Sequence, residues 1–531
     1  MTNDYDHTQK ISYQEPLGFT YIQIHLDWEY WLSSRFKWEQ NKVFITKGIS
    51  LARLALPLCL AFILFALRQD IKECRQISHS IWIPFTWLAL AASRPLSLWI
   101  YPSLGSAEIT GLDYIQGNPM ERTFSGILLC VGIMVLYKRR NRFAYYFRDN
   151  IYLSLFYIYA FISIGWSDYQ GASIRRWIRT TGDAIMVLLI LTENDQKEAI
   201  DHILRRCAIL LIPLSIVFIR YYSHIGISYS RDAGRMWIGV TTSKNSLGML
   251  CGFIGIFLVW RLLRGWPQYK VMILDGFLLF LTLYLLRGSG SATSYVIFVI
   301  GIIILVLGTY LKGNIRKFNT LVVVTFLLLL ILQGILISVF DESIPSLFFS
   351  AMARDPSFTG RAPLWLKLIK IGSQRPILGA GYGSVWIRDS SLTRAIFNES
   401  IQFNAHNGYI HVFMDLGLIG LSLIFLLIAQ TYKKIINSFD KSWETGILLL
   451  AFMLMIVFHN ITEATITRGQ NFLWFLFLLS SIIVVKKTGA QDAHSELRGW
   501  SFINHHSRNL FIFSKKQQKS GLKTIKVDPR S

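Results

Sequence analysis

One polar stretch of the chain carries residues suited to catalysis at a membrane surface. It runs from Asp341 to Gly420 and closes on His406-Asn407, just before an apolar segment that begins near Tyr409. A neutral imidazole can take a proton from a hydroxyl group as that hydroxyl attacks. A histidine at such a place can also be a structural hydrogen-bond partner, and both readings stay open here.

Arginines gather in the polar links around this stretch. Guanidinium groups bind phosphate through paired N–H bonds, so an anionic ligand is one explanation for them. Contacts with anionic headgroups or ion pairs with nearby acids are the other. The arginines are Arg361 within the stretch, Arg231 and Arg235 in the link before residue 243, and Arg175, Arg176 and Arg179 near residue 175.

Three further motifs lie in the same set of links. Ser243-Lys244-Asn245-Ser246 has the small polar residues that cap a helix, and its amides together with Lys244 suit an anion. The glycines of Gly379 to Gly383 lack the strand–helix context of a dinucleotide site, so we expect a turn that lets the backbone approach helices or a ligand. Glu463 and Arg468 flank the last turn on this side and can pair with each other.

No metal site is predicted. His411 follows His406 by five residues, which is roughly 140° around a helix, so the two rings do not share a face. The cysteines form no CxxC pair, and no run of carboxylates resembles a divalent-cation site.

The composition shows which elements must position these residues. The chain has 531 residues, of which 52% are hydrophobic and only 16% charged, against about 25% in ordinary soluble proteins. Repeated apolar runs of nearly twenty residues therefore predict an all-α, polytopic transmembrane bundle. We expect about twelve or thirteen spans, near residues 48–67, 79–100, 123–137, 150–165, 178–193, 203–220, 243–260, 269–286, 293–311, 319–340, 405–430, 445–465 and 470–485.

Basic residues orient the bundle. The links at 138–142, 312–317 and 433–434 and the tail after Lys486 are rich in Lys and Arg, which predicts that they face the cytoplasm. Alternation then places the polar stretch, including a large loop at 341–404, on the extracytoplasmic side. The same distribution argues against nucleic acid as the partner of a chain whose net charge is +22. We expect an N-terminal polar and aromatic arm at 1–47, a membrane domain at 48–486 and a basic cytoplasmic tail at 487–531.

Together these motifs resemble the O-antigen ligase and polysaccharide polymerase superfamily. His406-Asn407, nine residues, Gly417, two residues and Gly420 are similar to its His…Gly-x-x-Gly pattern, and the Gly360-Arg361…Trp365 and Pro376…Gly379-Ala380-Gly381 elements also resemble family motifs. Further similar elements are Trp166-Ser167, Lys244 to Gly248, and Ser93-Arg94-Pro95-Leu96-Ser97, which resembles an exopolysaccharide polymerase subgroup.

The resemblance implies a metal-independent glycosyltransferase with a fold related to the large helical membrane glycosyltransferases. The implied donor is a glycan on polyprenyl pyrophosphate, the implied acceptor a second glycan or the lipid A core, and the implied location the bacterial inner membrane with a periplasmic site. His406 and Arg361 are then the expected catalytic residues. Arg235 or Arg231, Lys244 and Asn407 are expected to bind the pyrophosphate, and no cofactor is implied.

Two other classes remain open. A lipid-glycan flippase would carry its polar site at the bilayer midplane in related halves, and we find no internal repeat. A membrane acyltransferase would also use a membrane-embedded histidine, but the arginines would then have no explanation.

Overall fold

The computed structural model describes residues 53–73, 77–101, 118–140, 149–230, 234–265, 269–325, 361–387 and 405–483. The chain divides into two compact units, Met1–Leu58 and Cys59–Ser531, and every contact reported below lies within the second. The predicted arm at 1–47, the tail at 487–531, most of the predicted span at 319–340 and much of the 341–404 loop fall outside the described residues.

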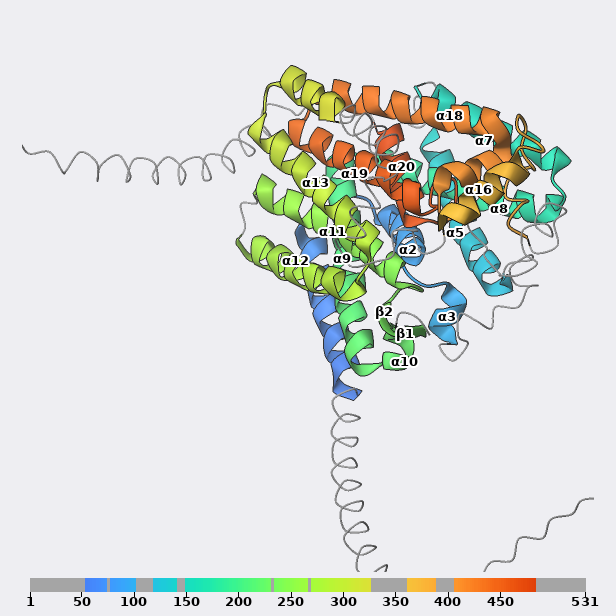
Figure 1. The fold of residues 1–531 in the computed structure, drawn as a ribbon. Helices are drawn as coiled ribbons and strands as arrows, with labels where there is room; N and C mark the ends of the chain where they lie inside the picture. Colours follow the sequence, from blue (N-terminus) through green and yellow to red (C-terminus); the bar gives the residue numbers. More distant parts are fainter. Residues whose placement is uncertain are drawn as a thin grey trace, which may run out of the picture. The chain divides into compact units, whose positions relative to one another are not determined.

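The described residues are almost entirely helical (Figure 1). An unlabelled helix covers Arg53–Glu73. The other elements are η1 (His79–Ile81), α2 (Trp82–Ala91), α3 (Leu96–Ile100), α5 (Pro119–Lys138), α7 (Ile151–Ile162), η2 (Ser163–Trp166), α8 (Gln170–Leu191), α9 (Gln196–Tyr221), α10 (Ser223–Gly226), β1 (Ile227–Ser230), β2 (Gly234–Trp237), α11 (Lys244–Arg264), α12 (Tyr269–Ser289), α13 (Ala292–Tyr310), α16 (Arg361–Gly372), α18 (Gly408–Ser438), α19 (Trp443–Thr462) and α20 (Phe472–Ile482).

The predicted all-α membrane bundle is confirmed. Eight described helices are long and apolar enough to cross a membrane, and two shorter apolar helices, Ile151–Trp166 and Phe472–Ile482, coincide with predicted spans. The sequence did not predict the small hairpin of β1 and β2, in which Tyr229 pairs with Arg235. The hairpin lies in the link between α10 and α11, where its two strands pair through backbone hydrogen bonds.

Capping residues explain where several helices begin. The side chain of Asn118 accepts a hydrogen bond from Met120 N before α5, and Ser243 Oγ accepts from Ser246 N before α11, as the sequence predicts. Asn407 and Asn471 do the same for α18 and α20. These caps satisfy amides that have no partner within their helix.

Burial separates inner from outer helices. The most apolar windows of α9, α11 and α19 are 89%, 78% and 72% buried, whereas that of α5 is 11% buried. All eleven side chains of α20 are buried, as expected for a helix that is apolar on every face. The exposed apolar side chains of α5 are suited to contact lipid.

The helix α18 is interrupted where the glycine loop 376–381 docks onto it. Gly417 has φ 63° inside α18, which breaks the helical hydrogen bonds. The loop supplies replacements: Ala380 N and Gly381 N donate to the carbonyls of Met414 and Asp415, and Leu418 N donates to Pro376 O. The expectation that these glycines let the backbone approach helices is therefore confirmed.

Candidate functional site

The site is built around His406, the residue before the cap of α18. The backbone of His406 has φ 48°, a left-handed conformation that residues other than glycine rarely adopt. Its ring is partly exposed, and Nδ1 lies 3.2 Å from Glu463 Oε2. Because a carboxylate only accepts, Nδ1 carries the hydrogen and the lone pair lies on Nε2. Nε2 is therefore the atom that can receive a proton.

Glu463 is held in place by a third element. It follows the last residue of α19, and its other oxygen, Oε1, accepts a hydrogen bond of 2.8 Å from Asn245 Nδ2 in the first turn of α11. The carboxylate thus connects the starts of α11 and α18 with the end of α19. Such an arrangement fixes both the tautomer and the direction of the histidine ring.

The turn after α19 is shaped by Asn460. Its Oδ1 accepts hydrogen bonds from Thr465 N and Ile466 N, both at 2.9 Å. Gly408 faces this side chain so closely that a Cβ there would lie 2.3 Å from Asn460 Oδ1. Glycine at the first residue of α18 therefore allows α18 and α19 to meet beside His406.

Asn407 is occupied by the cap. Its Oδ1 accepts from Tyr409 N at 2.9 Å and Ile410 N at 3.0 Å, and its Nδ2 donates to Ile461 O at 3.0 Å. This geometry gives Asn407 a positioning role next to His406. Because Nδ2 carries a second hydrogen, the prediction that Asn407 also contacts a pyrophosphate stays a prediction.

The helix α16 brings Arg361 toward the histidine. Arg361 is the first residue of α16, and Trp365, one turn later, donates from Nε1 to Ala405 O at 2.9 Å. Ala405 immediately precedes His406. An apolar cluster under α16, which includes Leu368, Ile371 and Met414, packs this helix on α18. The backbone therefore places the Arg361 position near the site, and the Arg361 side chain lies outside the described part of the chain.

Two of the remaining predicted ligands, Lys244 and Arg235, lie on α11 and on the strand that precedes it. Lys244 is the first residue of α11 and is partly buried, next to Asn245. Arg235 is exposed on β2, and Arg231 is outside the described residues. The connection from β2 to α11 is held by Arg94, whose Nη2 donates to Gly239 O at 2.6 Å and to Ile225 O at 3.0 Å. Arg94 thus acts as a structural anchor for the residues before Lys244.

Glu463 is the site residue that the sequence did not identify. The simplest expectation was an ion pair between Glu463 and Arg468. In the structure the Glu463 carboxylate contacts His406 and Asn245, whereas Arg468 Nη1 approaches Ala464 O at 3.4 Å. The three elements that meet at Glu463 are far apart in the sequence, so no local pattern could have shown this contact.

These features are those of a multi-pass, all-α membrane protein with a histidine–carboxylate pair between the start of α18 and the end of α19. Residues 277–425 match the family model described as O-antigen ligase. The matched segment contains Arg361, the glycine loop, His406 and Gly417. The resemblance stated from the motifs is thereby confirmed.

Curated relatives point the same way. The chain is 26% identical to the "Exopolysaccharide production protein ExoQ" of Rhizobium meliloti over 327 residues, which cover 59% of this chain and 72% of the relative. It is 27% identical over 243 residues to a "Putative polysaccharide ligase" of Rickettsia conorii, covering 42% of this chain and 56% of the relative. A similarly named protein of Rickettsia typhi is 29% identical over 225 residues, covering 40% of this chain and 52% of that relative. The chain thus spans little more than half the length of these ligase relatives.

Proposed function

We propose that this protein is a membrane glycosyltransferase of surface polysaccharide synthesis, which transfers or polymerises glycan from a polyprenyl-pyrophosphate donor at the extracytoplasmic face. The proposal rests on the His406–Glu463–Asn245 arrangement, in which His406 belongs to the segment that matches the O-antigen ligase model. The His406 ring is the proton acceptor. Its orientation is fixed because Glu463 bonds to Nδ1 and Asn245 in turn bonds to Glu463.

The chemistry follows from this geometry. His406 Nε2 takes the proton of an acceptor hydroxyl while that oxygen attacks the anomeric carbon of the donor sugar. The bond between the anomeric carbon and the pyrophosphate oxygen breaks, and polyprenyl pyrophosphate leaves with the bonding electrons. Glu463 stabilises the imidazolium that forms.

The leaving group needs positive charge rather than a second acid. Pyrophosphate is a good leaving group, so positioning and charge stabilisation can do most of the work. Arg361, Lys244 and Arg235 or Arg231 are the residues we assign to that charge. No metal ion is required in this scheme, so transfer should persist in excess EDTA.

The two versions of the proposed activity, polymerase and ligase, differ in the acceptor that receives the glycan. The name of the Rhizobium meliloti relative refers to exopolysaccharide production, which favours a polymerase that joins lipid-linked glycans. The names of the Rickettsia relatives favour a ligase. Among these, we favour the polymerase because the similarity to the exopolysaccharide protein covers more of both chains.

The test is a transfer assay with purified protein and an undecaprenyl-pyrophosphate oligosaccharide. Chain extension supports the polymerase, and transfer to added lipid A core supports the ligase. His406→Ala should lower the rate by about 10²–10⁴, the usual contribution of a general base. His224→Ala, which removes an exposed histidine on α10, is the control and should leave the rate unchanged. Flipping of the lipid-linked glycan without transfer, or transfer of an acyl group, would reject the proposal.

A further inference from the structure

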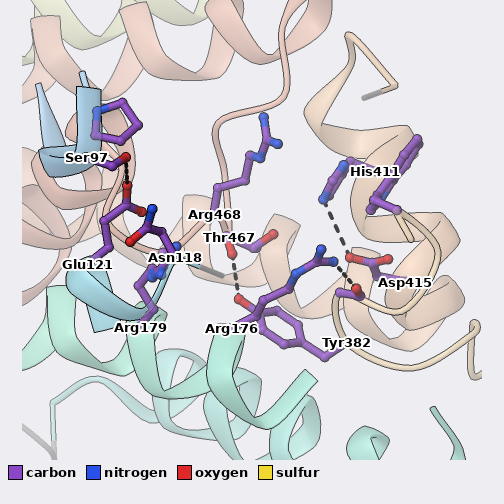
Figure 2. Close-up of a pocket in the computed structure, with 14 residues that line it drawn as sticks. Ser97, Asn118, Glu121, Arg176, Arg179, Tyr382, His411, Asp415, Thr467 and Arg468 are labelled. Carbon is purple, nitrogen blue, oxygen red and sulfur yellow. Dashed lines mark hydrogen bonds and ion pairs between the residues drawn. The ribbon is translucent and has the colours of Figure 1, made fainter. Parts of the chain in front are cut away.

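A polar cavity lies where α18 and the turn after α19 meet α3, α5 and α8. It has a volume of about 320 Å³ and is lined by residues of α3, α5, α8, the 382–386 loop, α18 and the turn after α19. Figure 2 shows its side chains converging from these elements, with His411 and Asp415 on one side and Arg179 and Glu121 on the other. Its volume is at the lower end of the range of small-molecule sites, about 300–1,000 Å³.

Positive charge exceeds negative charge in its lining. Three arginines, Arg176, Arg179 and Arg468, face two carboxylates, Glu121 and Asp415. One arginine is partly used by the fold, because Arg176 Nη1 donates to Gly383 O. Glu121 Oε1 accepts from Ser97 Oγ at 2.8 Å. The excess of guanidinium groups favours a ligand that carries an anionic group.

The wall formed by α18 contains buried polar atoms without partners. His411 is stacked on Trp386 with a centroid distance of 4.7 Å, and its Nε2 lies 3.5 Å from Asp415 Oδ2. Within the described residues, Trp386 Nε1, His411 Nδ1 and Asp415 Oδ1 have no hydrogen-bond partner, although all three side chains are more than nine-tenths buried. A buried polar group without a partner is unfavourable, so a ligand that supplies partners for these atoms would be stabilised by them.

These atoms restrict the chemistry of the ligand. Trp386 Nε1 is a donor and needs an acceptor, whereas the carboxylate oxygen Asp415 Oδ1 is an acceptor and needs a donor. A fully ionised phosphate or diphosphate only accepts, so it can pair with Trp386 Nε1 but offers no donor to Asp415 Oδ1. A sugar acid has hydroxyl groups that donate and a carboxylate that accepts.

The floor of the cavity is rigid. Burial raises the pKa of the Tyr382 phenol above its usual value, so the hydroxyl stays neutral and donates to Thr467 O at 2.6 Å. Tyr382 N also donates to Ser163 Oγ at 3.1 Å. The 382–386 loop therefore holds Trp386 in place without help from a ligand.

One short turn connects the cavity to His406. Glu463 begins the turn after α19 and binds His406, and Arg468, five residues on, lines the cavity. A glycan that reacts at His406 can therefore place a neighbouring sugar residue against Arg468.

We propose that this cavity binds a carboxylate-bearing sugar residue of the glycan substrate, with Arg179 and Arg468 pairing with the carboxylate and Trp386 and Asp415 bonding to ring oxygens and hydroxyls. The assignment to the substrate rests on the proposed glycosyltransferase function. It makes the cavity a specificity site for acidic polysaccharides, separate from the residues assigned to the reacting atoms.

The test compares two probes that differ only in the anionic group. Methyl β-glucuronoside and methyl β-glucoside are titrated into the purified full-length protein, with binding followed by ligand-observed NMR. The glucuronoside should bind at least tenfold more tightly than the glucoside. The double variant Arg179→Gln/Arg468→Gln should remove that preference, whereas Arg375→Gln, which removes an exposed arginine outside the cavity, should keep it.

Trp386→Phe provides a second variant that keeps the ring stacked on His411 and removes only the N–H donor. It should weaken glucuronoside binding severalfold with no change in thermal unfolding. Equal binding of the two probes, or a preference that survives in both the double variant and Trp386→Phe, overturns the proposal. Inorganic pyrophosphate is the third probe: if it binds more tightly than the glucuronoside and loses affinity in the double variant, the cavity is a diphosphate site and the proposal is wrong.

The two proposals fail in different ways. His406→Ala should lower the transfer rate by about 10²–10⁴ and leave glucuronoside binding intact. If no transfer is found with any donor but the carboxylate preference depends on Arg179 and Arg468, the cavity assignment holds as a sugar-acid site and the glycosyltransferase proposal fails.

Discussion

His406 combines an uncommon backbone conformation with a directed side chain. Its φ of 48° lies in the left-handed region, which costs a residue other than glycine about 1–3 kcal/mol unless its surroundings impose it. Here the surroundings are the Asn407 cap on one side and the Trp365–Ala405 hydrogen bond on the other. The Asn407 cap and the Trp365–Ala405 hydrogen bond therefore hold the strained backbone in place. In this conformation the His406 ring faces Glu463.

Glu463 should act through the direction of the His406 ring. We expect Glu463→Ala to lower kcat by about 10²-fold, the size of effect that follows when a reacting group is misplaced by about 1 Å. Because Glu463 is not assigned to the substrate, KM for the donor should change little. Steady-state kinetics with the lipid-linked donor measures both quantities.

Asn245→Ala provides the matched comparison, since it removes the second hydrogen bond to the Glu463 carboxylate but no charge. We expect a smaller loss of kcat from it than from Glu463→Ala. An unchanged kcat in Glu463→Ala would show that the carboxylate does not orient the base.

At the scale of elements, the site depends on the interruption of α18. The His…Gly-x-x-Gly spacing places Gly417 where the helix unwinds, and the left-handed φ of this glycine lets the 376–381 loop dock against it. A Cβ at Gly417 would lie 2.2 Å from Ile377 O. The motif therefore encodes a joint between α18 and the loop, in addition to the catalytic candidate at its start.

Gly417→Ala should open this joint. The added methyl group meets backbone, which cannot move aside as a flexible side chain can, and the positive φ adds strain, so we expect a loss of at least about 1–3 kcal/mol of stability. The measurement is thermal unfolding of the purified protein in detergent.

Gly276→Ala on α12 is the control, because a Cβ there meets nothing within 4 Å and alanine favours a helix. It should unfold at the same temperature as the wild type or slightly higher. Equal stability of the Gly417 and Gly276 variants would contradict the role of Gly417 as a required joint.

At the scale of the whole membrane unit, a buried ionic network connects the ends of the helices that lie away from His406. Asp275 of α12 accepts from Arg205 Nε of α9 at 3.0 Å and from Arg261 Nε of α11 at 2.8 Å. Asp70, in the first helix, accepts from Arg206 Nε at 2.7 Å in the same network. Arg261 lies seventeen residues after Lys244 in α11, about 25 Å along the helix, so the network is remote from the site.

Asp275→Ala should destabilise the bundle strongly. It removes a carboxylate that two buried guanidinium groups share, although both keep other acidic partners. Removing one partner of an isolated buried ion pair costs about 3–5 kcal/mol, which is the upper limit here. We expect a sharp loss of folded protein in size-exclusion chromatography and a lower unfolding temperature. Lys270→Gln, an exposed change on the same helix, is the control and should leave the yield of folded protein and the unfolding temperature unaltered. If Asp275→Ala gives the same yield and unfolding temperature as Lys270→Gln, the network is not needed for folding.

The predicted orientation of the bundle is tested by labelling. In a variant without the five native cysteines, a cysteine in place of Tyr229 on β1 should react with a membrane-impermeant maleimide in right-side-out spheroplasts. A cysteine in place of Lys433 should react only after permeabilisation. The reverse pattern would place His406 on the cytoplasmic side and remove the basis for a lipid-linked donor at the outer face.

The amino-acid sequence was enough to predict the membrane class, the approximate position of most helices, the cap at Ser243 and the family-like motif that begins at His406. These features are local: apolar run length, capping residues and short spacings are read from neighbouring residues. The three-dimensional fold was needed to show that Glu463 contacts His406 and that Arg94 anchors the segment before Lys244. It was also needed to show that one cavity is lined by Arg179, Arg468, Trp386 and Asp415. Those contacts join residues from different helices, and which helix faces which is set by the packing of the whole bundle rather than by any short pattern in the chain.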